Sequence, residues 1–222
     1  MIENLQYISQ KPKKGTHLDA IEAALAAGSK WIQLRIKDLE PEAILDFARQ
    51  AVALCTSAGA KLIVNDYPEI ALKAGAYGVH LGLQDMSIRE ARAIVGPNMI
   101  IGGTANTFEH ILQRVDEGVD YIGLGPYRFT HTKQNLSPII GLTGYTNILK
   151  CVREAGLQTP IIGIGGIVAS DIPALLQTGL FGVAVSGALT DQEDLTAIFH
   201  RMQTAIGSTS TLSLKPLNQF SC

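Results

Sequence analysis

The sequence has few cysteines and no strongly charged or long apolar segment. Its three cysteines lack the spacing of a metal site, and an odd number argues against a disulfide framework. The formal net charge is −2 without a basic or acidic block, so a role on nucleic acid or a membrane surface has no electrostatic support. No apolar run approaches the roughly 18 residues needed to cross a bilayer. The N-terminus lacks a signal peptide's apolar segment. We therefore expect a cytoplasmic protein that binds neither nucleic acid nor membranes.

Apolar residues are abundant, and their periodicity changes regularly along the chain. They make up 46% of the sequence, which is enough for a sizeable core. Short continuous apolar runs, typical of buried strands, alternate with segments of helical period. The predicted strands are residues 5–8, 31–36, 61–64, 78–81, 99–102, 121–124, 160–164 and 182–185. The predicted helices are residues 17–27, 41–58, 69–74, 87–95, 107–117, 143–155, 171–177 and 194–206.

This alternation of strands and helices predicts an α/β fold, a single-domain (β/α)8 TIM barrel. Strand starts that are mostly about 17–30 residues apart match βα units and a parallel sheet. The chain length is also close to the roughly 250 residues typical of this barrel. A doubly wound open sheet is the alternative. We expect the barrel to occupy residues 1–206 and residues 207–222 to form a disordered tail.

The longest predicted loop follows the strand at residues 121–124. Gly125-Pro126 ends this strand, because proline lacks the ladder donor and fixes its own φ. No helical period resumes for roughly 18 residues, and loops of that length in a compact domain are usually functional or disordered. The loop contains Thr130, Thr132 and Lys133, whose hydroxyls and ammonium suit the oxygens of a phosphate or diphosphate. A solvated surface loop is the alternative.

Groups able to bind a ligand follow nearly every predicted strand. In a barrel, the loops after the strands carry the chemistry. In chain order these groups are Gln33, Arg35 and Lys37; Asn65 and Asp66; Gln84 and Asp85; Thr104 and Asn106; Thr130, Thr132 and Lys133; Gly165 and Gly166; Ser186 and Gly187. Their recurrence favours a single active-site mouth more strongly than any one motif does.

The second predicted strand carries two cations and an amide on alternate positions. Gln33, Arg35 and Lys37 point to one side of it, and burying them in a parallel barrel is costly without an anion to pair with. A strand that is merely polar on one face is the alternative. Asp66 and Asp85 lie one βα unit apart, and two carboxylates near phosphate oxygens suit Mg²⁺. Alone, the first of these acids is more typical of a turn with a helix cap.

Glycines cluster after the seventh and eighth predicted strands, in Gly163–Gly166 and Val185–Gly187. Loops at these positions commonly hold a phosphate through backbone N–H groups, and glycine permits the close approach. The sequence thus predicts two anion sites in one mouth, a glycine-lined monophosphate site and a charged site suited to a diphosphate. Glycines that only ease tight turns are the alternative. We interpret His80 as a hydrogen-bonded core histidine rather than a ligand.

Six motifs, in this order, resemble the thiamine phosphate synthase family over roughly residues 5–206. They are QLRIK (33–37), VND (64–66), GVHLGLQD (78–85), GLGPYRFTHTK (123–133), GIGGI (163–167) and VAVSGAL (183–189). The resemblance implies a barrel transferase that uses Mg²⁺. It would join a hydroxymethylpyrimidine diphosphate to a (carboxy)thiazole phosphate, giving thiamine monophosphate and diphosphate.

By position, the resemblance also implies roles for individual residues. The pyrimidine diphosphate would be held by Gln33, Arg35, Lys37, Asn65, Thr104 and Lys133. The thiazole phosphate would be held by Thr130, Thr132, Gly166, Val185 and Ser186. The Mg²⁺ ion would be bound by Asp66 and Asp85. Catalysis would come from charge stabilisation of the leaving diphosphate by Arg35, Lys37 and Lys133.

Three positions depart from the usual family pattern. Thr104 stands where serine is usual, Asn106 where histidine is usual, and Tyr67 where a basic residue often occurs. Threonine keeps the hydroxyl, whereas Tyr67 is expected to weaken anion binding. One alternative is a thiazole tautomerase of the same fold, which the missing histidine at Asn106 disfavours. Others are a phosphosugar isomerase and a non-catalytic phosphometabolite-binding barrel. The sequence does not fix the oligomeric state, and a homodimer is compatible with it.

Overall fold

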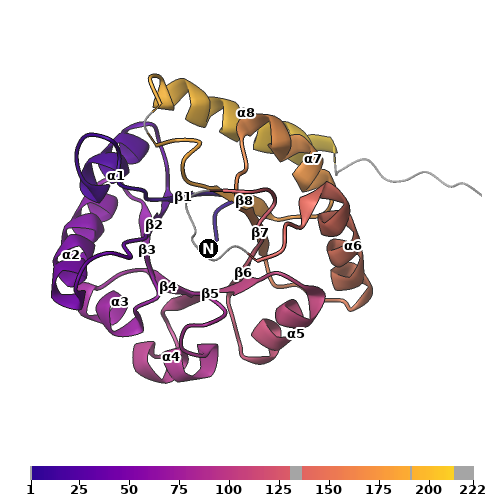
Figure 1. Ribbon diagram of the computed structural model, residues 1–222, viewed down its shortest axis with the longest axis horizontal. Helices are drawn as coiled ribbons and strands as arrows, with labels where there is room; N and C mark the ends of the chain where they lie inside the picture. Colours follow the sequence, from indigo (N-terminus) through magenta and orange to yellow (C-terminus); the bar gives the residue numbers. More distant parts are fainter. Residues whose placement is uncertain (1, 131–136, 191, 213–222) are drawn as a thin grey trace, which may run out of the picture.

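The computed structural model describes residues 2–130, 137–190 and 192–212, which form a closed parallel barrel inside a ring of helices (Figure 1). The strands are β1 (Leu5–Ile8), β2 (Trp31–Leu34), β3 (Lys61–Asn65), β4 (Gly78–Leu81), β5 (Ile100–Ala105), β6 (Tyr121–Leu124), β7 (Ile161–Ile164) and β8 (Gly182–Val185). The helices are α1 (His17–Ala26), α2 (Pro41–Ser57), α3 (Pro68–Ala74), α4 (Ile88–Val95), α5 (Phe108–Asp116), α6 (Gly141–Glu154), η1 (Ala169–Asp171), α7 (Ile172–Gln177) and α8 (Leu195–Leu212).

The barrel closes because its first strand pairs with both its second and its last. Strand β1 aligns Tyr7 with Ile32 of β2, and it aligns Leu5 with Val183 of β8. The remaining neighbours pair in sequence order, and every pair is parallel. The predicted (β/α)8 barrel is therefore confirmed, and the open doubly wound sheet is excluded.

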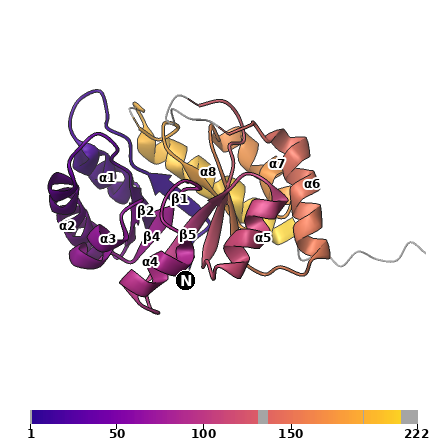
Figure 2. The ribbon, with the colours of Figure 1, turned by 60° about the horizontal axis from the view of Figure 1, so that its bottom comes forward.

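The apolar side chains form two separate cores, as the two faces of barrel strands require. The larger core lies between the strands and the surrounding helices, and Figure 2 shows this helical layer from the side. A smaller core fills the barrel itself and is made of Ile8, Trp31, Ile63, Tyr121, Ile162 and Ala184. Layers of inward-pointing side chains are what makes such a barrel a packed core rather than a pore.

Strand β2 is shorter than predicted, and this changes the placement of the predicted cations. The strand ends at Leu34 rather than Ile36, so Arg35 and Lys37 belong to the following loop. The Arg35 N–H donates to the Ser9 side-chain hydroxyl at 3.1 Å instead of to a neighbouring strand. Strand β5 is longer than predicted and ends at Ala105, which places Thr104 within the strand.

The C-terminal helix is also longer than predicted. Helix α8 continues to Leu212, past the expected end of the ordered chain at Ile206. Ser208 is compatible with this helix because its hydroxyl donates to the Thr204 carbonyl at 2.8 Å, one turn earlier. Residues 207–212 of the predicted tail thus belong to α8 in the structure, and residues 213–222 lie outside the described residues, so the predicted disorder of the tail stays a prediction.

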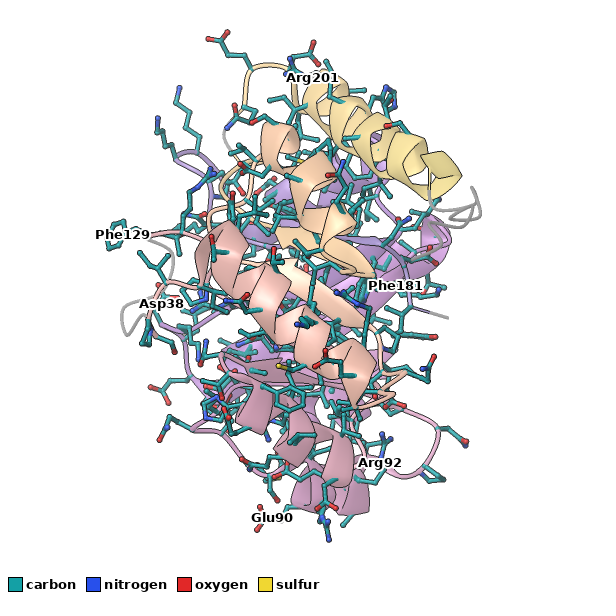
Figure 3. All side chains as sticks on the ribbon, turned by 90° about the vertical axis from the view of Figure 1, so that its right-hand side faces the viewer. Asp38, Glu90, Arg92, Phe129, Phe181 and Arg201 are labelled. Carbon is teal, nitrogen blue, oxygen red and sulfur yellow. The ribbon has the colours of Figure 1, made fainter. Side chains whose placement is uncertain are left out.

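The two ends of the barrel are separated clearly in a side view. Figure 3 shows Phe129, which follows β6, and Asp38, which follows β2, projecting from the same end of the molecule. Phe181 immediately precedes β8 and lies at the opposite end. Loops that follow strands thus share one face, which is the face where barrel chemistry takes place.

Candidate active site

A cavity of about 420 Å³ opens at the end of the barrel where the strands finish. Six residues of the predicted site line it, and they come from five strands or the loops that follow them: Arg35, Thr104, Thr130, Gly166, Val185 and Ser186. The structure thus brings the predicted thiazole phosphate residues that it describes together with two of the predicted diphosphate residues. Thr132 and Lys133 lie outside the described residues.

One wall of the cavity is backbone-rich. Gly165 and Gly166 after β7 have φ angles of 95° and 70°, a region that side chains other than glycine rarely adopt. A Cβ at Gly166 would also overlap the Arg128 side chain and lie 3.1 Å from the Phe129 carbonyl oxygen. Glycine is therefore required both by the turn and by close packing. This wall leaves main chain at the cavity surface, which suits a phosphate group.

Arg35 lies between this wall and a cluster of charged residues. Burial lowers the pKa of the Arg35 guanidinium, and the nearby Asp66 carboxylate acts in the opposite direction. Arginine remains charged at any physiological pH. A half-buried cation therefore faces a cavity whose other walls are largely neutral, an arrangement that favours an anionic ligand.

The charged cluster is built around two carboxyl groups from successive strand ends. Asp66 follows β3 with a φ of 69°, and its side chain hydrogen-bonds with that of Asp85. The Gly82 N–H holds Asp85 by donating to its Oδ2 at 2.6 Å, and the Lys37 ammonium pairs with Asp66. The predicted proximity of the two carboxylates is therefore observed. Lys37 belongs to the same cluster, although its side chain is exposed.

Two further predicted residues are buried near this cluster but do not line the cavity. The Gln33 side chain in β2 is 2% exposed, and its Nε2 has no hydrogen-bond partner among the described residues. Asn65 ends β3 and pairs in register with His80 of β4. An orphaned buried amide donor is costly. The roles predicted for Gln33 and Asn65 in holding the diphosphate substrate stay predictions.

His80 is a buried histidine with hydrogen bonds at both ring nitrogens, which confirms the interpretation from sequence. Nδ1 lies 3.1 Å from the Tyr121 hydroxyl and Nε2 lies 3.1 Å from the Thr104 hydroxyl. The nearby Asn106 donates from Nδ2 to the Gly125 carbonyl, and its buried Oδ1 has no partner among the described residues. Asn106 thus ties the end of β5 to the end of β6.

Arg114 on α5 also supports the site, although we did not predict it from the sequence. Its side chain is 3% exposed and donates to the carbonyls of Gly82 at 2.8 Å and Thr104 at 3.3 Å. It therefore ties the loop that carries Asp85 to the strand that carries Thr104. The sequence does contain an indication of this buried arginine. Arg114 stands three residues after buried Ile111, on the helix face where an apolar residue is expected.

Replacing Arg114 with methionine should lower the free energy of unfolding by roughly 3 kcal/mol, because it leaves Glu117 and two carbonyls without their buried cation. Urea denaturation followed by circular dichroism measures this. Arg92→Met is the matched control, because Arg92 also donates to two carbonyls and pairs with Asp120. Arg92 is more exposed than Arg114, so its replacement should lower the free energy of unfolding by less. Equal losses in the two variants would contradict this role for Arg114.

The carboxyl pair should give the metal-free protein a characteristic pH dependence. Burial, followed by the hydrogen bond with Asp85, raises the pKa of Asp66 to about 6, although Lys37 acts in the opposite direction. An unfolded aspartate has already lost its proton near pH 4. The native state therefore binds more protons between about pH 4 and 6, and the free energy of unfolding should fall as pH rises through this window.

Denaturation at a series of pH values from 4 to 7.5 tests this expectation. The Asp66→Asn variant carries no titrating group at this position, so its stability should fall less than that of the wild type across the same window. Parallel curves for the two proteins would show that Asp66 does not titrate as its surroundings indicate.

The described residues include neither a helix able to span a membrane nor a cluster of three or more metal-binding side chains. None of the helices within them is long and apolar enough to cross a bilayer. No group of three or more His, Cys, Asp or Glu side chains in this part of the chain could hold a metal. A cation at Asp66 and Asp85 would thus have two protein carboxylates, with water or substrate oxygens completing its coordination.

Comparison with known proteins places the chain in a recognised family. The sequence profile described as thiamine monophosphate synthase matches residues 5–189, which include all the strands. The chain belongs to the thiamine monophosphate synthase family. Relatives of this family include a thiamine-phosphate synthase of Bacteroides fragilis, 49% identical over 191 residues that cover 86% of this chain and 94% of the relative.

Other members of the thiamine monophosphate synthase family support the same placement. A thiamine-phosphate synthase of Flavobacterium johnsoniae is 46% identical over 194 residues, covering 87% of this chain and 92% of that one. The solved structure of a thiamine phosphate pyrophosphorylase from Pyrococcus furiosus superposes with a TM-score of 0.80 at 28% identity, covering 93% of this chain and 96% of that chain. As a member of this family, the chain is a transferase.

Proposed function

We propose that this transferase joins 4-amino-2-methyl-5-hydroxymethylpyrimidine diphosphate to a (carboxy)thiazole phosphate, forming thiamine monophosphate and releasing diphosphate. When the thiazole carries the carboxyl group, that group leaves as CO₂. Family membership supports the reaction type. The observation that supports the proposal is a backbone-rich wall and a charged cluster at one end of the barrel, with Arg35 next to both, which we interpret as two unlike anion sites. One site is the glycine wall after β7 and β8, and the other is the charged cluster after β2, β3 and β4.

The charged cluster fits a magnesium ion. Mg²⁺ prefers carboxylate and phosphate oxygens and usually keeps several water ligands. Asp66 and Asp85 offer such oxygens, and the proximity of Asp85 contributes, after burial, to the raised pKa of Asp66. Asp66 and Asp85 would hold the ion, which would supply positive charge near the leaving diphosphate.

The cationic side chains act on the leaving group. We assign Arg35 and Lys37, together with Lys133 from the loop after β6, to the oxygens of the pyrimidine diphosphate. Gln33, Asn65 and Thr104 would hold its remaining polar atoms. These preorganised charges favour breakage of the bond between the pyrimidine CH₂ carbon and the diphosphate oxygen, with both electrons leaving on the diphosphate. The CH₂ carbon gains carbocation character as this bond breaks.

The glycine wall positions the nucleophile. Backbone N–H groups at Gly166, Val185 and Ser186, together with the hydroxyls of Thr130 and Thr132, would hold the thiazole phosphate. The ring nitrogen then captures the pyrimidine carbon and becomes the positively charged thiazolium nitrogen of the product. Positioning of this kind contributes by holding the two reacting atoms together. No protein group needs to form a covalent bond.

The cysteines that the structure describes do not suit nucleophilic catalysis. Burial raises the pKa of the Cys55 thiol to about 12, and this residue lies in α2 rather than at a strand end. Cys151 lies in α6, also away from the strand ends. His80, the histidine next to Thr104, is already engaged by two hydroxyls. A displacement driven by charge stabilisation and positioning is therefore the chemistry that these residues support best.

The product formed from defined substrates tests the proposed function. With the pyrimidine diphosphate, the thiazole phosphate and Mg²⁺ together, mass spectrometry should detect thiamine monophosphate. With the thiazole phosphate alone in deuterated water, the synthase should leave the substrate unchanged. Deuterium incorporation without any condensation product would instead identify a tautomerase, and binding of both compounds without a reaction would identify a phosphometabolite-binding protein.

A further inference from the structure

A chain of buried hydrogen bonds crosses the barrel interior and ends at the cavity. The Gln6 amide donates to the Tyr121 hydroxyl at 3.5 Å, and this hydroxyl lies 3.1 Å from His80 Nδ1. His80 Nε2 lies 3.1 Å from the hydroxyl of Thr104, which lines the cavity. These four residues come from β1, β6, β4 and β5, so the chain links strands that are distant in sequence.

The barrel reserves space for this chain. A Cβ at Gly102 would overlap both the Tyr121 ring and His80 Nδ1, and a Cβ at Gly123 would lie 3.1 Å from His80 Cε1. Neither glycine has a positive φ, so the backbone conformation alone does not require glycine at these positions. The ring of Trp31 packs edge-on against Tyr121 at 5.0 Å between centroids. Both the glycines and Trp31 therefore fix the positions of the two rings.

The donors and acceptors along the chain set the direction of its protons. The Gln6 amide nitrogen can only donate, so the Tyr121 oxygen accepts from it and gives its own proton to the next acceptor. Burial raises the pKa of Tyr121 far above its ordinary range, which keeps the phenol protonated. His80 Nδ1 is that acceptor, which places the ring proton on Nε2 and directs it to Thr104 Oγ1.

We infer that His80 and Tyr121 are positioning residues that hold the Thr104 hydroxyl as a hydrogen-bond donor toward the cavity. Thr104 accepts a hydrogen bond from His80, so its own proton is available for the oxygens of an anionic ligand. The assignment of that anion as the substrate diphosphate rests on the proposed function. The orientation of the protons does not rest on the proposed function, because it follows from the hydrogen bonds within the protein alone.

The histidine tautomer of the ligand-free protein tests the inference directly. Nitrogen-15 spectra of the full chain labelled at histidine should show the His80 proton on Nε2 at neutral pH, with the signal assigned by its loss in His80→Asn. In Tyr121→Phe the donor to Nδ1 is missing, and the population with the proton on Nδ1 should rise. A wild-type ring protonated on Nδ1 would overturn the inference, and this measurement requires no activity.

Calorimetric measurement of the binding of inorganic diphosphate with Mg²⁺ tests whether the Thr104 hydroxyl donates to an anionic ligand. Tyr121→Phe and Thr104→Val should each raise its Kd roughly tenfold, the effect of one hydrogen bond to a charged group. Thr104→Ser, which keeps the hydroxyl, should bind as the wild type does. In the active enzyme, KM for the pyrimidine diphosphate should rise with Kd, and KM for the thiazole phosphate should not change.

A double-mutant cycle separates positioning from a general structural effect. Adding Tyr121→Phe to Thr104→Val should cause no further rise in the Kd of diphosphate, because the hydroxyl that Tyr121 orients is already absent. Tyr7→Phe is the matched control: Tyr7 is also buried and its hydroxyl lies 2.8 Å from that of Thr190, but it belongs to the core outside the barrel. It should leave the Kd unchanged. Additive losses in the cycle, or an equal loss in Tyr7→Phe, would overturn the inference.

Discussion

Replacing Arg35 with alanine should lower kcat for thiamine monophosphate formation by about 10²–10³-fold, the usual effect of removing one preorganised group that stabilises developing charge. Arg35 is the half-buried cation that lines the cavity and lies close enough to Asp66 for the two charges to interact. The charge on the leaving diphosphate develops as the bond breaks, so the loss should appear in kcat rather than only in KM. Rapid-mixing or steady-state assays of diphosphate release measure it.

Two further variants show whether the position of the charge matters. Arg89→Ala removes an exposed arginine that pairs with Asp116 on the outside of the barrel, and it should leave the rate within about twofold. Arg35→Lys keeps a charge but loses the forked donor, so its kcat should lie between those of the wild type and Arg35→Ala. If Arg35→Ala turns over at a near-normal rate, the leaving group is not stabilised in the way we propose.

Replacing Asp66 with asparagine should lower the Mg²⁺-dependent rate by a similar factor of about 10²–10³ while leaving the fold at least as stable near neutral pH. The side chain keeps its size and one oxygen but loses the charge that a divalent cation requires. The variant should lose rate without losing stability because the pKa of Asp66 is raised. An ionised carboxylate at this position therefore costs stability in the absence of metal.

Asp46→Asn provides the control for this second variant. Asp46 is an exposed carboxylate on α2 that pairs with Arg49 one turn along the same helix, and its loss should affect neither the rate nor the response to Mg²⁺. Asp85→Asn should resemble Asp66→Asn, because both carboxylates are proposed to share the cation. An Asp66→Asn enzyme that retains the wild-type Mg²⁺ dependence would exclude a metal site at this pair.

Local patterns in the sequence predict most of the fold, because each element is bounded by chemistry that acts over a few residues. Gly125-Pro126 ends β6 at Leu124, and Ser87 with Glu90 forms the predicted capping box at the start of α4. The predicted end of β2 lies too far along the sequence, because the Arg35 N–H donates its hydrogen bond to the Ser9 hydroxyl and not to a neighbouring strand. Ser9 is 26 residues away in the sequence. No local pattern reports such a contact.

The candidate site, too, could be predicted only in part from local sequence patterns. Polar groups after successive strands could be predicted to share one face, because parallel strands end together, and the carboxyl pair of Asp66 and Asp85 follows from that rule. The network behind Thr104 could not be predicted, since it depends on which residues of β4, β5 and β6 point into the barrel at the same height. The role of Gly102 in making room for Tyr121 and His80 likewise appears only in three dimensions.

Release of diphosphate under four conditions tests most directly whether the two anion sites work together. The purified chain is supplied with both substrates and Mg²⁺, with either substrate omitted, or with the metal removed by a chelator. We predict rapid release only in the complete mixture, with one thiamine monophosphate formed per diphosphate. Equally rapid release without the thiazole phosphate, or without Mg²⁺, would contradict a metal-assisted displacement in which both sites are occupied.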